Sequence, residues 1–307
     1  MNKRLFTFGC SFTNYGWPTW ADIVSQDYDC YENWGKGGGG NKFIHSSLIE
    51  CHQRNNITAD DTVMVMWSSQ AREDRFLRGK WHTKGSVYNS DYSQEFIEKF
   101  TDTTGYLLDT VTYMQSSYHI LNAIGCEKHF FSMLPMSIGD DTDYWLTGLI
   151  KKLTPTVSDN ILKLYAPVLK FTKPSVHKTV FNSDWHSRDD KIIPQALNAS
   201  REIFSKQYNK VAGSDWPTFD NFFDSKIDDI EPHIMEEIDK QFNFVHWRDD
   251  IKYRRHDPHP TPIEHLEYLD CVKFPVSIKA RDFAKHWEDR VMADTNTWKI
   301  VKAQGRF

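Results

Sequence analysis

Four short apolar segments alternate with amphipathic stretches in the first 135 residues of this chain. The segments have the length and composition of strands and span residues 5–8, 30–34, 62–67 and 128–134. The third, TVMVMW, is apolar throughout, which is typical of a strand buried on both faces and therefore of a parallel sheet. Apolar residues at helical spacing predict helices over residues 17–25, 42–55 and 96–125. The alternation predicts an α/β fold, a three-layer α/β/α arrangement around a mainly parallel sheet.

The pattern changes after residue 136. Residues 137–245 are richer in charge and show no strong strand pattern, so we expect a helical insertion or cap there. Its helical stretches are expected over residues 161–166, 194–208 and 230–242. Residues 1–136 and 246–307 are expected to form the α/β core, which closes with helices over 263–269 and 277–292.

Polar and glycine-rich segments follow the predicted strands. Gly9, Cys10 and Ser11 come directly after the first strand, and a run of glycines at 35–40 follows the second. In an open parallel sheet ligands bind outside the carboxyl ends of the strands, so these segments are expected at one rim. A proline-rich loop, RRHDPHPTP at 254–262, adds histidines and a carboxylate.

Together these groups have the chemistry of an acyl-transfer site. A serine hydroxyl becomes a nucleophile when an imidazole takes its proton, and a carboxylate orients that imidazole. Glycine N–H groups at the start of a helix can stabilise the developing oxyanion. The glycine run matches neither phosphate-binding pattern, GxxxxGK[ST] or GxGxxG with its partner acid, so nucleotide binding is not favoured.

These segments resemble the SGNH (GDSL-type) hydrolase family. Residues 9–13 (GCSFT) are similar to its first block, with Ser11 as the nucleophile and Cys10 where the family usually has Asp. Residues 33–38 (NWGKGG) resemble the second block and place an oxyanion glycine at Gly38. His259, followed by Pro260, resembles the final block and its catalytic base. Cys10 is a less favoured nucleophile, because it is expected to point away from Ser11.

The chain departs from the family pattern at the acid. The family usually places it three residues before the base, where this chain has His256. Asp257, two residues before His259, is the expected orienting carboxylate, and His256 is the alternative.

A second departure concerns the third block, where the family offers an Asn as an oxyanion donor. Residues 67–72 read WSSQAR, and Ser69 is the favoured substitute. Ser68, Gln70 and Arg72 are the alternatives. Arg72 and Asn41 are further candidates for substrate binding.

The resemblance implies a flavodoxin-like SGNH hydrolase fold and a serine esterase that works through an acyl-enzyme on Ser11. An O-acyl ester on a carbohydrate or similar small polar molecule is the expected substrate, with no cofactor and no metal. The alternatives are an acyltransferase with the same triad and a catalytically inactive binding or structural protein. The combined motifs also resemble SGNH-like proteins encoded by phages.

Composition narrows the expected partners and compartment. The net charge of −5 argues against a nucleic-acid binder, and no apolar stretch approaches the length of a membrane span. The apolar run at the N-terminus is too short for a signal peptide. The five cysteines are odd in number and lack a CxxC spacing, which favours neither a disulfide framework nor a zinc site. We therefore expect a cytoplasmic protein of the producing cell, which is virus-encoded if the phage resemblance holds.

Overall fold

The computed structural model describes residues 3–87, 92–134, 160–161, 163–180, 194–241, 244–249 and 259–293. The chain divides into two units. The first comprises residues 1–185, 259–288 and 298–307, and the second comprises residues 186–258 and 289–297.

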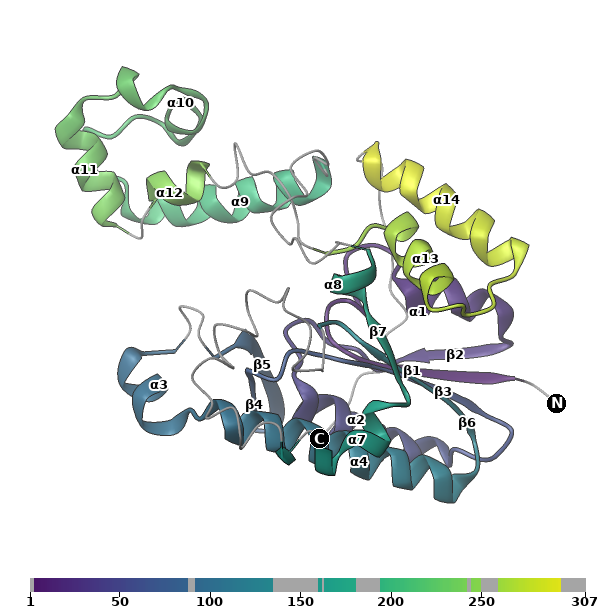
Figure 1. Cartoon of the computed structure of the whole chain (residues 1–307). Helices are drawn as coiled ribbons and strands as arrows, with labels where there is room; N and C mark the ends of the chain where they lie inside the picture. Colours follow the sequence, from purple (N-terminus) through teal and green to yellow (C-terminus); the bar gives the residue numbers. More distant parts are fainter. Residues whose placement is uncertain are drawn as a thin grey trace. The chain divides into compact units, whose positions relative to one another are not determined.

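A five-stranded parallel sheet forms the centre of the first unit (Figure 1). Its strands, in spatial order, are β2 (Cys30–Asn33), β1 (Arg4–Phe8), β3 (Thr62–Trp67), β6 (Glu127–Ser132) and β7 (Thr172–Ser175). This is the flavodoxin-like order, in which the chain runs to one side of β1 and then to the other. The carboxyl ends of β1 and β3 therefore lie at the point where such sheets bind ligands.

Helices cover both faces of this sheet and complete the predicted three-layer α/β/α fold. One face packs on α1 (Trp20–Val24), α13 (Pro262–Cys271) and α14 (Ile278–Met292). The other packs on α2 (Asn41–Asn55), α4 (Thr103–Ile124) and α7 (Ala166–Leu169). Alternation along β3 divides the two cores: Met64 and Met66 face the first group of helices, whereas Val63 and Val65 face the second.

The structure contains strands that the pattern of hydrophobic residues did not predict. An antiparallel hairpin of β4 (Arg72–Leu77) and β5 (Lys80–Ser86) follows β3. The sequence of β4, REDRFL, lacks the apolar alternation of a half-buried strand. The strand β7 (TKPS) lies at the sheet edge, where Pro174 is tolerated.

The predicted helix over residues 96–125 is two helices. A first helix, α3 (Gln94–Phe100), ends at Thr101, and α4 begins anew after Asp102. The Asp102 carboxylate accepts the N–H of Gly105 and caps α4, which ends at Gly125 in the left-handed conformation. Shorter elements of this unit are the 3-10 turn η1 (Ser25–Asp27) and α8 (Val176–Thr179).

The second unit has a core of its own. Its helices are α9 (Pro194–Val211), α10 (Phe219–Asp224), η2 (Ile227–Asp229), α11 (Pro232–Lys240) and α12 (Phe244–Asp249). They bury an aromatic cluster around Phe204, Tyr208 and Phe222. No strand occurs among the described residues of this unit. The strand β7, by contrast, lies within residues 137–245 and belongs to the first unit. Throughout the described parts of the chain, no helix combines the length and apolar composition needed to cross a bilayer.

Candidate active site

The loop between β1 and α1 carries Ser11. The N–H groups of Thr13 and Asn14 both donate to the carbonyl of Cys10, at 3.0 and 3.1 Å, so the chain turns sharply after the strand. This turn requires glycine at position 9, since a Cβ there would lie 1.9 Å from the hydroxyl oxygen of Thr13. The side chain of Ser11 is 8% exposed.

Cys10 points into the core beneath this loop. It is fully buried in the cluster that packs on α1 and α13, and its sulfur lies 3.5 Å from that of Met133. The thiol is therefore a core group, which agrees with the expectation that it points away from Ser11.

The glycine-rich segment after β2 is tied to the Ser11 loop. Asn33 donates to the carbonyl of Thr13 at 2.7 Å and accepts the N–H of Gly35 at 2.9 Å. Asn14 donates back to the carbonyl of Gly35 at 2.8 Å. The bonds from Asn33 to Thr13 and from Asn14 to Gly35 hold the first two motif segments together, as the sequence predicts for a common rim.

Gly38, the predicted oxyanion glycine, lies against β5. Its φ of 72° is in the left-handed region, and a Cβ there would lie 2.5 Å from the carbonyl oxygen of Thr83. Its own carbonyl accepts the N–H of Gly85 at 3.1 Å. The close approach of the hairpin therefore explains why position 38 needs glycine, and the role of its N–H as an oxyanion donor stays a prediction.

Asn41 holds the turn after β3. Its side-chain oxygen accepts the N–H of Ser68 at 2.8 Å, and its amide donates to the carbonyl of Ser68 and the hydroxyl of Thr110, both at 3.1 Å. Ser68 is buried, whereas the favoured oxyanion residue Ser69 is half-buried. The side chain of Asn41 thus fixes the backbone that presents Ser69.

Two charged side chains of β4 form hydrogen bonds with the backbone at the start of α2. Arg72 donates to the carbonyl of Gly39 at 2.9 Å and reaches the sulfur of Met133 at 3.7 Å. Asp74 accepts the N–H groups of Gly40 and Phe43, each at 2.9 Å. Burial of the Asp74 carboxyl raises its pKa to about 6, although these two donors favour the charged form. Arg72 therefore lies beside the same methionine that Cys10 contacts under the Ser11 loop.

His259 packs against the loop that carries Ser11. The rings of His259 and Tyr15 stack at 3.7 Å with an interplanar angle of 15°, and the ring of Phe12 meets the imidazole edge-on at 5.4 Å. The indole N–H of Trp17 donates to the carbonyl of Pro260 at 2.8 Å. In the part of the chain that the structure describes, no hydrogen bond joins Ser11 to His259.

The start of α13 fixes the chain just after His259. Thr261 and Glu264 form a capping box, in which the N–H of Thr261 donates to the Glu264 carboxylate at 2.8 Å. Glu264 is the third residue of the helix, where a capping box has Glu or Gln. The predicted acid Asp257 and its alternative His256 lie outside the described residues.

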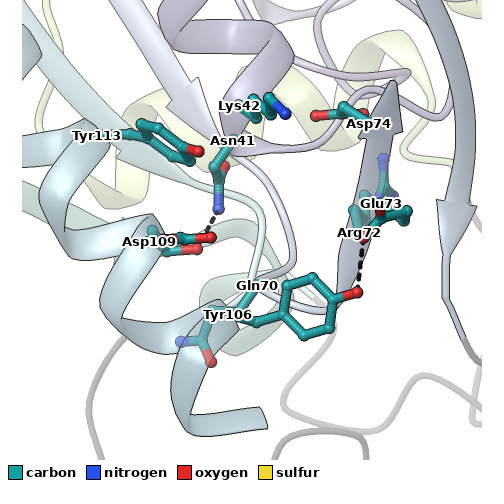
Figure 2. A pocket seen from close by; sticks show the side chains of 10 residues that line it. Asn41, Lys42, Gln70, Arg72, Glu73, Asp74, Tyr106, Asp109 and Tyr113 are labelled. Atoms are coloured by element: carbon teal, nitrogen blue, oxygen red, sulfur yellow. Dashed lines mark hydrogen bonds between the residues drawn. The ribbon is translucent and has the colours of Figure 1, made fainter. Parts of the chain in front are cut away.

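A polar pocket of about 140 Å³ opens beside these segments (Figure 2). Its lining consists of Asn41, Lys42, Gln70, Arg72, Glu73, Asp74, Tyr106, Asp109, Thr110 and Tyr113. The hydroxyl of Tyr106 donates to the Glu73 carboxylate at 2.6 Å, which links α4 to β4 across it. The sequence predicted Asn41, Gln70 and Arg72 at the rim. It carried no signal for the residues of α4, because their polar face looked like an ordinary solvated helix surface.

No grouping of His, Cys, Asp or Glu side chains suited to a metal ion occurs among the described residues. Of the predicted site, the structure brings the Ser11 loop, the Gly35 turn and His259 together. It places Arg72 and Asn41 at the adjoining pocket.

Sequence comparisons leave the family of the chain open, since no family model and no curated protein matches it. Matches among solved structures include a lipolytic protein of the G-D-S-L family from Veillonella parvula DSM 2008. It is 15% identical with a TM-score of 0.34, over 61% of this chain and 85% of the other. A second, described as an acylhydrolase from Bacteroides fragilis NCTC 9343, is also 15% identical, with a TM-score of 0.30, over 56% and 66%.

Proposed function

We propose that this chain is a serine esterase of the SGNH type. The observation that carries the proposal is the contact between the Ser11 loop and His259, through the stacked ring of Tyr15 and the edge of Phe12. Residues 12–258, most of the chain, lie between Ser11 and His259 in sequence. A serine at the carboxyl end of the first strand and a histidine packed on its loop are the two groups that acyl transfer needs.

In the proposed reaction the Ser11 hydroxyl oxygen attacks the acyl carbonyl while His259 accepts its proton. The tetrahedral intermediate collapses to an acyl-enzyme, and His259 returns the proton to the departing alcohol oxygen. Water then attacks the acyl-enzyme with His259 again as base, which releases the acid and restores Ser11. In this proposal Asp257 orients His259, and the N–H groups of Ser11 and Gly38 with the side chain of Ser69 stabilise the oxyanion.

The polar pocket supports a hydroxyl-rich substrate. Its lining offers carboxylates, amides and two tyrosines, which together can donate to and accept from sugar hydroxyls. A lipid acyl chain would desolvate these groups without replacing their hydrogen bonds. We therefore infer that the pocket takes the alcohol part of an O-acylated carbohydrate or similar polar ester.

A fluorophosphonate probe tests the nucleophile directly. We expect intact-mass analysis to show one adduct on the wild-type chain and none on Ser11→Ala, with Cys10→Ala still labelled as the matched control. Absence of an adduct on the wild-type chain would contradict the serine-hydrolase proposal and favour a binding protein. Labelling together with faster acyl transfer to an added sugar than to water would identify an acyltransferase.

A further inference from the structure

The β4–β5 hairpin concentrates positive charge on an acidic chain. Residues 75–84 include four Lys or Arg side chains and no carboxylate, whereas the net charge of the chain is −5. Pairing of Leu77 with Lys80 places the turn at Arg78 and Gly79. Arg78 and Lys80 are exposed, and no described ion pair includes them.

The two faces of the hairpin differ in their surroundings. Phe76 and Trp81 are paired across the strands, with ring centroids 5.5 Å apart, and Trp81 also meets Phe43 of α2 at 5.6 Å. The opposite face carries Arg75, Leu77 and Lys80, because successive strand residues alternate in direction. Arg75 is paired with Glu73 at 3.0 Å and lies over the ring of Phe96 at 4.6 Å, so Lys80 is the exposed cation of this face beside the turn. The tip therefore presents Arg78 and Lys80 to solvent, whereas Trp81 packs on Phe43 and Phe76 stays 42% exposed beside it.

The turn is also strained at Arg78. Its φ is 52° and that of Gly79 is 75°, so both central residues are left-handed, as in a type I′ turn. Asn and Gly are the residues that such a turn favours, and an arginine there is held in a costly conformation. Strain of this kind is typical of positions kept for function.

The same strand joins the tip to the polar pocket. β4 supplies Arg72, Glu73 and Asp74 to the pocket lining (Figure 2). The strand then continues to Leu77 at the tip. Leu77 lies five residue steps along the strand from Arg72, which corresponds to about 17 Å at about 3.3 Å per residue. A ligand that contacts both must be longer than a single sugar.

We propose that the hairpin tip, residues 77–80, binds an acidic polysaccharide and guides it toward the pocket. That this polymer is the substrate rests on the proposed esterase function, whereas its binding does not. The charge distribution fits this polymer: its acidic groups meet Arg78 and Lys80, and a neutral, acylated sugar enters the pocket beside Glu73 and Asp109.

Two other polyanions fit less well. Nucleic acid carries a phosphate at every step and offers no neutral unit for the pocket, whereas an acylated acidic polysaccharide can include one. An anionic membrane would need more apolar surface than Phe76 and Leu77 offer, since these side chains are 42% and 49% exposed and Phe76 is packed on Trp81.

Binding of polygalacturonate, which has no acyl ester, provides the test. We expect the wild-type chain to bind it, to lose affinity when salt rises from about 50 to about 300 mM, and not to bind dextran. Arg78→Gly with Lys80→Thr should weaken binding about tenfold, as removal of two charge contacts implies. The matched control, Lys210→Thr with Lys285→Thr, removes two exposed cations elsewhere and should leave affinity unchanged.

Several outcomes would overturn the proposal. These are no polygalacturonate binding, equal losses in both double variants, or tighter binding to single-stranded DNA or to phosphatidylserine vesicles. The fluorophosphonate experiment separates this result from the esterase proposal, because labelling of Ser11 does not depend on the polymer. Hairpin-dependent binding without labelling would support the docking surface and contradict the esterase.

Discussion

Among the residues that the structure describes, Tyr15 makes the closest ring contact to His259. Two nearly parallel rings 3.7 Å apart restrict rotation of the imidazole, so Tyr15 is a positioning residue in the proposed reaction. We expect Tyr15→Ala to lower kcat about tenfold to a hundredfold with little change in KM, since a misplaced base affects the chemical step. Tyr15→Phe, which keeps the ring, should retain most of kcat. Steady-state hydrolysis of p-nitrophenyl acetate measures both values.

Equal kcat values for Tyr15→Ala and the wild type would contradict this role. A loss shared by Tyr15→Phe would assign the effect to the hydroxyl instead of the ring. Circular dichroism melting curves of both variants serve as the folding control.

Asp22 is a buried carboxyl group behind the Ser11 loop. It accepts the N–H of Thr19 at 2.8 Å and the hydroxyl of Tyr31 at 3.1 Å. Burial raises its pKa to about 6, and the hydrogen bonds offset only part of this shift. The carboxyl group of Asp22 therefore binds a proton more tightly in the folded chain than in the unfolded chain.

The pKa of Asp22 predicts a pH-dependent contribution to stability. This stabilising contribution is fully present below pH 3.8, the pKa of Asp22 in the unfolded chain, and is lost as pH rises through about 6, its pKa in the folded chain. The change amounts to up to ~3 kcal/mol. In Asp22→Asn this titration is absent, so the free energy of unfolding relative to wild type should rise between pH 4 and pH 7. Urea denaturation at both pH values measures the difference, and a difference that is independent of pH would refute the assignment.

The turn of the β4–β5 hairpin holds Arg78 in a left-handed conformation that is unfavourable for arginine. We expect Arg78→Gly to raise the free energy of unfolding by ~0.5–1 kcal/mol, because glycine adopts a φ of 52° without strain. Gly79→Ala is the matched control and should be destabilising, since a Cβ there meets no neighbouring atom and only the backbone conformation is affected. A destabilised Arg78→Gly, measured by urea denaturation, would show that the arginine side chain stabilises the hairpin.

Elements differ in how far their own residues reveal them. The strand β3 is apolar at all six positions, so its burial follows from composition alone. β4 is charged and its pairing with β5 depends on packing against α2, which local periodicity does not record. The break between α3 and α4 depends on the Asp102 cap, a signal that the surrounding helical pattern obscured.

Two separate cores imply two unfolding events. The sheet core around Val65 lies in the first unit, and the aromatic cluster around Phe222 lies in the second. We expect Phe222→Ala to lower the free energy of unfolding of the second unit by ~3–5 kcal/mol and to lower the midpoint temperature of one calorimetric transition. Val65→Ala should lower the midpoint temperature of the other transition. A single transition that both variants shift equally would indicate that the units unfold together.

The residues alone determined the parallel three-layer fold and the position of Ser11 after the first strand, because strand burial and periodicity are local properties. They also indicated His259 through its motif. Only the tertiary structure decided that the indole N–H of Trp17 donates to the carbonyl of Pro260, 243 positions away. It also decided that the ring of Tyr15 stacks on the ring of His259. Such contacts arise when distant segments pack on a common sheet edge. The pocket between α4 and β4 has the same origin, since neither element carries a local signal that it faces the other.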